Sequence, residues 1–153
     1  MNEIIKNNLE ERSIVLSASV APKYEYVTST SAGALMFFSG KTAQINGVIV
    51  NPGLLGDELS IEQGREAAIV CATNLLSQME SDIGLENIEQ ILKLAGFVAS
   101  TPNFFDQPTV INAASELFVA ILGDAGKHAR SAIGVAALPG NSAVEIELII
   151  KSK

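Results

Sequence analysis

The sequence predicts a single α+β domain over residues 1–153, with a mixed β-sheet and two main helices packed on one of its faces. Two observations favour this class. Apolar residues recur at helical spacing in two long segments, 60–83 and 106–122, and alternate or run together in shorter segments typical of strands. These segments follow the order strands, helix, strand, helix, strands, which is typical of an α+β domain. A chain of 153 residues suffices for one such domain.

The first third of the chain is expected to contribute a short helix and three strands. Their predicted ranges are 3–11 for the helix, an extension of the domain, and 13–19, 34–39 and 43–50 for the strands. Gly40 separates the second and third strands. Asn46-Gly47 is typical of a turn or bulge, and residues 52–57 are typical of a loop.

The two main helices carry recognisable end signals. Ser60 and Gln63 form a capping-box pattern at the start of the 60–83 helix, and Gly84 can end it. Asp106 suits the N-cap of the second helix, and Gly123 can end it. Both segments have one apolar face, which we expect to pack on the sheet.

The remaining strands are predicted on either side of the second helix. Residues 88–100 form one strand, and 128–151 have the pattern of a β-hairpin with its turn at Pro139-Gly140-Asn141. In that hairpin Ile133 and Ile146 are expected to share the face that the helices cover.

The opposite face of the predicted hairpin carries small residues and isolated charges, among them Arg130 and Glu145. Small residues allow another backbone to approach closely, so we infer a subunit contact there. The guanidinium of Arg130 is suited to hold a carboxylate through two hydrogen bonds, although a structural ion pair at the contact is the alternative. Along one straight hairpin Arg130 and Glu145 would lie roughly 20 Å apart. A shared site therefore requires a second subunit or a bent sheet.

Charge and composition exclude several classes of function. The formal net charge is −7 and no Lys/Arg cluster occurs, so nucleic acid is not an expected partner. No uncharged apolar run reaches the ~18 residues of a membrane span, and the N-terminus lacks the pattern of a signal peptide. We therefore expect a cytoplasmic protein. His128 and Cys71 are single residues of their types, so no metal site is predicted.

Three segments resemble the RidA/YjgF family: "LMFFSGK", "DQPTVINAASELFVAILGDAGKHARS" and "ARSAIGVAALPGNSAVEIELII". The similarity extends over about residues 24–150. It implies a chorismate-mutase-like fold and a homotrimer whose sheets line a central β-barrel, with ligand sites in the clefts between subunits. RidA-type members hydrolyse reactive 2-imino or enamine acids to 2-oxo acids and ammonia without a cofactor.

By this resemblance Arg130 would hold the substrate carboxylate and Glu145 would hold or activate the attacking water. The same resemblance implies further pocket residues: Ser39, Gly40, Asn112, and either Tyr24 or Tyr26. His128 replaces the family's usual proline, and it is either a proton carrier or ligand contact in the cleft or a residue that caps the preceding loop.

The chain also departs from the family pattern. Ala132 and Gly134 stand where cysteine and glutamate are frequent, and Lys41 replaces glutamine. These features indicate a distinct, longer branch and leave its substrate open. The alternatives are a trimer that binds small carboxylates without turnover and a ribonuclease, which the acidic charge and the single histidine, His128, disfavour.

Overall fold

The computed structural model describes residues 1–18, 22 and 24–153. Three helices carry the labels α1 (Glu3–Glu11), α2 (Ile61–Asp82) and α3 (Gln107–Leu122). The strands are β1 (Ser29–Ala32), β2 (Leu35–Thr42), β3 (Gln44–Ile45), β4 (Val48–Ile49), β5 (Ile88–Ala99), β6 (Ala129–Val135) and β7 (Val144–Ser152). Short 3-10 helices are η1 (Leu85–Asn87), η2 (Gly123–Gly126) and η3 (Pro139–Asn141).

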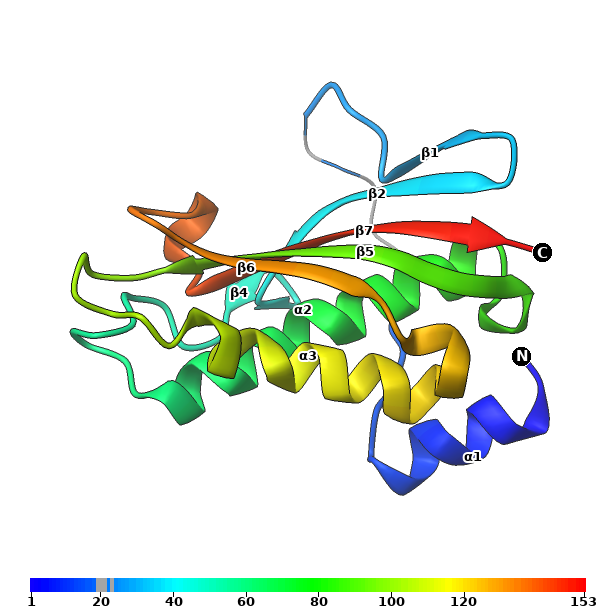
Figure 1. Cartoon of the computed structure of the whole chain (residues 1–153), viewed down its shortest axis with the longest axis horizontal. Coiled ribbons are helices and arrows are strands. Elements are labelled where there is room, and N and C mark those ends of the chain that lie inside the picture. Colours follow the sequence, from blue (N-terminus) through cyan, green and yellow to red (C-terminus); the bar gives the residue numbers. More distant parts are fainter. Residues whose placement is uncertain (19–21, 23) are drawn as a thin grey trace.

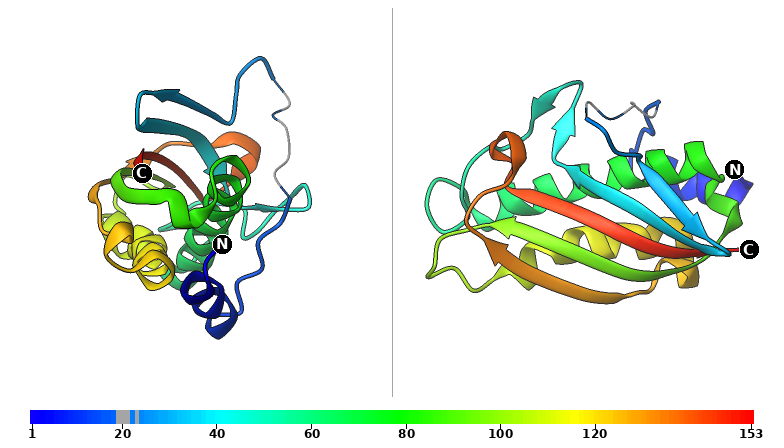
Figure 2. Two further views of the ribbon diagram at one scale, coloured as in Figure 1. Left: turned by 90° about the vertical axis from the view of Figure 1, so that its right-hand side faces the viewer. Right: turned by 90° about the horizontal axis from the view of Figure 1, so that it is seen from above.

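A five-stranded sheet of order β1-β2-β7-β5-β6 organises the domain. The β5–β6 pair is parallel and the other pairs are antiparallel, so the sheet is mixed, as predicted. Helices α2 and α3 lie side by side on one face, and the described chain leaves the other face open (Figures 1 and 2). We call these the helix face and the open face. The α+β architecture with two main helices on one face is thereby confirmed.

The hydrophobic core lies between the helix face and the two long helices. Ile146 and Leu148 of β7, Leu94 of β5, Leu75 of α2 and Phe118 of α3 are all buried there. Burying one such side chain stabilises the fold by about 1.5–3 kcal/mol. The core therefore fixes the orientation of every strand, since alternate residues of each strand must point into it.

Both main helices begin and end where the sequence predicts. Ser60 Oγ accepts a hydrogen bond from the Gln63 backbone N–H, and Gln63 Oε1 accepts one from the Ser60 backbone N–H, which completes the capping box. Gly84 and Gly123 have φ of 77° and 63°, a backbone conformation that glycine adopts without strain. Asp106 is the N-cap of α3, although its side chain makes no capping hydrogen bond.

Helix α3 is apolar because it is a core helix. By length and hydropathy alone residues 107–126 would also suit a membrane span, but 44% of that segment is buried inside the domain. Helix α1, predicted as an extension, packs Ile5 and Leu9 against the core, and its Asn8 side chain donates to the Ile121 carbonyl at the end of α3.

The predicted C-terminal hairpin is wrong. Strands β6 and β7 do not pair, because β5 lies between them and pairs in parallel with β6. The predicted faces of β6 are also inverted: Ile133 is 50% exposed on the open face, whereas Arg130 points toward α3. Alternation shows that a strand has two faces, but it does not identify its neighbours or the face that the helices cover.

Three expectations in the N-terminal part also need correction. Residues 14–18 of the predicted strand 13–19 form no strand, and its last residue lies outside the described part. Strand β1 was not predicted, because its sequence is polar. The 34–39 strand continues as β2 through Gly40, with a register shift between Phe38 and Lys41, and the range 43–50 divides into β3 and β4. Asn46 and Gly47, with φ of 51° and 85°, form the turn between them, as predicted.

Candidate functional site

The residues predicted for the site fall into two groups at different places in the fold. Arg130, Asn112 and His128 gather where edge strand β6 meets α3. Ser39, Gly40 and Glu145 gather around the bulge of β2 and the start of β7. We call these groups the arginine half-site and the glutamate half-site.

Arg130 is half-buried and points from β6 to α3. One of its terminal nitrogens, Nη1, donates to Asn112 Oδ1 and to Ser115 Oγ, each at 3.2 Å. Its Nε and Nη2 donate to no residue in the described ranges, and no carboxylate within those ranges pairs with it. The nearby Glu116 is engaged elsewhere, with Asn112 and with Arg65. The arginine half-site therefore holds a positioned guanidinium with unused donors.

His128 is held at both ring nitrogens. Nδ1 lies 2.7 Å from the Gly126 carbonyl oxygen and Nε2 lies 2.9 Å from Ser115 Oγ. Because a carbonyl can only accept, Nδ1 carries the proton in the neutral ring, and Nε2 accepts from the Ser115 hydroxyl. Burial lowers the pKa of His128 from 6.5; the hydrogen bond to Gly126 opposes this shift, and the positive charge of Arg130 adds a smaller lowering. The ring is thus neutral near pH 7.

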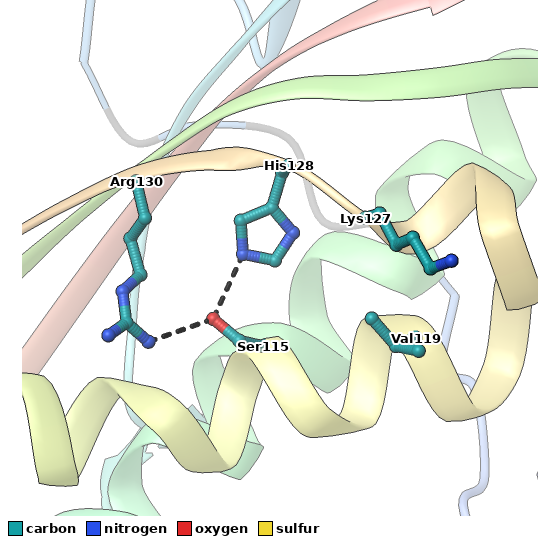
Figure 3. A pocket seen from close by; sticks show the side chains of 5 residues that line it. All are labelled: Ser115, Val119, Lys127, His128 and Arg130. Atoms are coloured by element: carbon teal, nitrogen blue, oxygen red, sulfur yellow. Dashed lines mark hydrogen bonds between the residues drawn. The ribbon is translucent and has the colours of Figure 1, made fainter.

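A pocket of about 290 Å³ opens between α3 and β6. Its lining residues are Ser115, Val119, Lys127, His128 and Arg130 (Figure 3). In the close-up, the side chains of Arg130 on β6 and of His128 just before that strand both reach toward the Ser115 hydroxyl on the helix. Ser115 is absent from the residues that the sequence predicts for this site. Its only signal is position, since it follows Asn112 by three residues and shares that helix face.

Glu145 is the centre of the glutamate half-site. Its carboxylate packs on Gly40, where a β-carbon would collide with it, so a larger residue at this bulge would displace the Glu145 carboxylate from its present position. Burial, together with the neighbouring charge of Glu147, raises the pKa of Glu145 above 4.5. The Ser39 hydroxyl donates to the Val27 carbonyl at 2.7 Å and so joins β2 to the preceding loop.

The two predicted tyrosines lie in that loop before β1. Tyr24 is 78% and Tyr26 is 51% exposed, and neither reaches the arginine half-site in the described chain. The loop is nevertheless tied to the glutamate half-site through the Ser39–Val27 bond. The choice between the two tyrosines therefore stays open.

The two half-sites lie on opposite faces of the sheet. Arg130 is opposite Leu94, which points into the core, whereas Glu145 is opposite Phe97, whose other neighbour in the row is the exposed Ile133. The arginine half-site is at the β6 edge, and Ser39 is on β2, next to the β1 edge. One chain therefore does not bring the two groups together.

Two departures from the family pattern have local physical reasons. A β-carbon at Gly134 would lie 2.8 Å from both Gln107 Nε2 and Ser100 Oγ, so these polar groups occupy the space that a larger side chain would need. Lys41 points to α2, where it donates to Gln78 Oε1 at 3.1 Å, and burial lowers its pKa. Lys41 thus belongs to the contact between β2 and α2.

The other groups considered for a reactive role are possible metal ligands and the thiol of Cys71. No cluster of three or more His, Cys, Asp or Glu side chains suited to a metal occurs among the described residues. Cys71 is buried on α2, donates to the Val144 carbonyl at 3.4 Å, and has a pKa raised by burial, so its thiol is inert.

Comparisons with known proteins agree with this fold. A family model described as "YjgF/chorismate mutase-like, putative endoribonuclease" matches residues 7–151. Protein TCP17 of Trypanosoma cruzi is 36% identical over 146 residues, which cover 94% of this chain and 91% of that protein. The crystal structure of Atu1372, a protein of unknown function from Agrobacterium tumefaciens, is 38% identical, with a TM-score of 0.91 and coverage of 98% of this chain and 92% of that one. The YjgF gene product of E. coli is 25% identical, with a TM-score of 0.63 and coverage of 90% and 96%.

Proposed function

The chain belongs to the YjgF/chorismate mutase-like family, and from this premise we propose that it hydrolyses reactive 2-imino or enamine acids to 2-oxo acids and ammonia. The reaction takes place in clefts between copies of a homotrimer and requires no cofactor. Arg130 of one copy holds the substrate carboxylate, and Glu145 of the next copy holds or activates the attacking water. We place this activity in the cytoplasm.

The state of Arg130 is the observation that supports the proposal most. A half-buried guanidinium usually has an acidic partner, because leaving it without one forfeits the strongest hydrogen bonds available to it. Here Asn112 and Ser115 hold one nitrogen, and Nε and Nη2 stay without a partner in the described chain. A carboxylate from solution would complete this set.

The division into half-sites supports a closed ring of copies. Complementary surfaces at opposite edges of one protein associate head to tail, and such contacts close into a ring when the rotation allows. The open face also carries exposed apolar side chains, with Phe37 40% and Ile133 50% exposed, that a solitary domain would leave in water. A trimer that buries this face as a barrel lining accounts for both features.

The proposed reaction requires few catalytic groups from the protein. The imine carbon is already electrophilic, so a held substrate and one oriented water suffice. Water adds to that carbon and gives its proton to Glu145, whose raised pKa makes it a better base than an ordinary carboxylate. Glu145 passes that proton to the nitrogen, and the added hydroxyl then gives its own proton to the nitrogen as the C=O bond forms. The C–N bond breaks, which releases ammonia and the 2-oxo acid.

The experiment uses an imine generated in place. A dehydratase acting on threonine releases the 2-imino acid, and its decay is followed with and without this protein. We expect faster decay with the wild-type chain and none of that acceleration with Arg130→Ala. Equal decay rates with and without the wild-type chain would exclude the hydrolase.

A second candidate is a trimer that binds small carboxylates without turnover. It is favoured by the small, non-reactive residues Ala132 and Gly134, where the family often carries cysteine and glutamate. Calorimetric binding of a 2-oxo acid without imine turnover would support it. The family description also includes endoribonuclease activity, which the net charge of −7 disfavours and an RNA-cleavage assay tests.

A further inference from the structure

We propose that Ser115, with His128 as its base and Arg130 beside it, is a nucleophilic acyl-accepting site for small activated esters or thioesters. This activity is independent of imine hydrolysis, because it needs neither Glu145 nor a second copy of the chain. All three side chains line the same pocket of about 290 Å³.

The orientation of the Ser115 hydroxyl is the first argument. A serine inside a helix commonly donates to the carbonyl four residues earlier, as Ser77 does to Thr73 at 2.8 Å. Ser115, inside α3, forms no such bond in the described chain and lies 2.9 Å from His128 Nε2 instead. The hydroxyl proton therefore already points at the atom that would remove it.

The fixed tautomer of His128 is the second argument. A nucleophilic serine needs a base within hydrogen-bond reach and a third group that orients the base. The Gly126 carbonyl is that third group, since it accepts from Nδ1 at 2.7 Å and leaves the lone pair of Nε2 facing Ser115. His128 is partly buried and neutral near pH 7, so the lone pair is available.

The third argument is that Arg130 can stabilise the negative charge that develops during the attack. Its Nη1 lies 3.2 Å from Ser115 Oγ, so the guanidinium adjoins the point of attack. Negative charge develops on the carbonyl oxygen when the serine attacks, and positioned donors beside that oxygen lower the barrier. Nε and Nη2 of Arg130, which have no partner among the described residues, are such donors.

The step balances without a co-reactant. Ser115 Oγ forms a bond to the acyl carbon, and its proton moves to His128 Nε2. The bond from that carbon to the leaving alkoxide or thiolate breaks, and the leaving group takes the proton from His128. Water then releases the carboxylic acid by the reverse sequence, with His128 again as base and Ser115 restored.

A purely structural network of these residues is the alternative. It predicts the same distances but no reactivity. The charged groups around His128 do not distinguish a reactive serine from a structural network. Arg130 and Lys127 are cationic. Both nearby carboxylates already have cationic partners, since Asp124 pairs with Lys127 at 2.7 Å and Glu116 pairs with Arg65. Chemical modification decides.

The first experiment treats the intact protein with 4-nitrophenyl acetate and locates the acetyl group by peptide mass spectrometry. We expect one acetyl group on Ser115, no such label in Ser115→Ala, and labelling at least ~100-fold slower in His128→Gln. Ser131→Ala is the matched control, because that serine is on the same strand as Arg130 but on the open face. An unlabelled wild-type Ser115 without accelerated release of 4-nitrophenol, or equal labelling in His128→Gln, would overturn the proposal.

The second experiment replaces the nucleophile. Iodoacetamide alkylates a thiolate, and a cationic neighbourhood lowers a thiol pKa by about one unit or more. We therefore expect Ser115→Cys to react about tenfold faster at pH 7 than Ser31→Cys at an exposed position of β1, with the buried Cys71 as a silent background. Ser131 is unsuitable for this comparison because its hydroxyl accepts from the Lys93 ammonium at 2.9 Å. Equal rates for the two introduced cysteines would refute the activation.

Discussion

Mixing two inactive variants should restore activity if each site joins half-sites from two copies. Arg130→Ala removes the carboxylate partner, which costs about 3 kcal/mol or more for two charge-assisted hydrogen bonds, a factor of roughly 150. Glu145→Gln removes the base. Arg130 and Glu145 lie on opposite faces of one sheet. In the proposed ring each site would therefore take its arginine from one copy and its glutamate from the next. In a 1:1 random mixture both residues are native at about one site in four.

The assay follows from this count. The two variants are unfolded, mixed and refolded together, native mass spectrometry verifies mixed oligomers, and imine decay is measured. We expect about a quarter of wild-type activity, against less than about a hundredth for either variant alone. A mixture of Arg130→Ala with the double variant is the control, because no copy then carries the arginine. Mixed oligomers without recovered activity would refute a site shared between copies.

Three further predictions concern single substitutions. Ile133→Asp places a charge on the open face and should dissociate the oligomer without unfolding the chain, as measured by ultracentrifugation with circular dichroism; an unchanged sedimentation coefficient would contradict the barrel. Arg130→Lys keeps the positive charge but loses the planar guanidinium that can donate two parallel hydrogen bonds to a carboxylate, so calorimetry should show 2-oxo acid affinity reduced about 10–100-fold. The raised pKa of Glu145 means that the folded chain binds this proton more tightly than the unfolded chain, so the contribution is present below pH 4.5 and lost as the pH rises through the folded pKa. Glu145→Gln should therefore unfold at a higher urea concentration than wild type at pH 7.5 but not at pH 4, and an equal gain at both would exclude the titration of Glu145 as its cause.

The helix ends could be predicted from the sequence because their causes are local. Ser60 and Gln63 bond each other across three residues, and Gly84 and Gly123 supply positive φ where each helix stops. The Asn46-Gly47 turn is local in the same way. Such signals depend on neighbours in the chain and on nothing else in the fold.

Strand neighbours could not be predicted, because they depend on the path of the whole chain. Strands β6 and β7 are joined by a short turn, which favours a hairpin, yet β5 lies between them. The parallel β5–β6 pair, connected through α3, turns Arg130 toward the helices and Ile133 away from them. From the sequence alone, Ile133 is expected in the core. Its exposure can be interpreted as a contact surface only once the structure shows that one face of the sheet is uncovered. Ser115 was missed for a related reason, since only the contact of α3 with β6 gives it partners.

The surroundings of Arg130 indicate how the proposed acid ligand would lie in a chain that departs from its family's pattern. A side chain at Gly134 would contact Gln107 Nε2 and Ser100 Oγ, so a glutamate there would require these groups to move. The polar groups lie on the other side, where Ser115 and His128 adjoin the guanidinium. A ligand held by Arg130 would thus extend toward the start of β6 and α3. Its specificity would then depend on the residues that line this end of the pocket, Val119 and Lys127 beside Ser115 and His128.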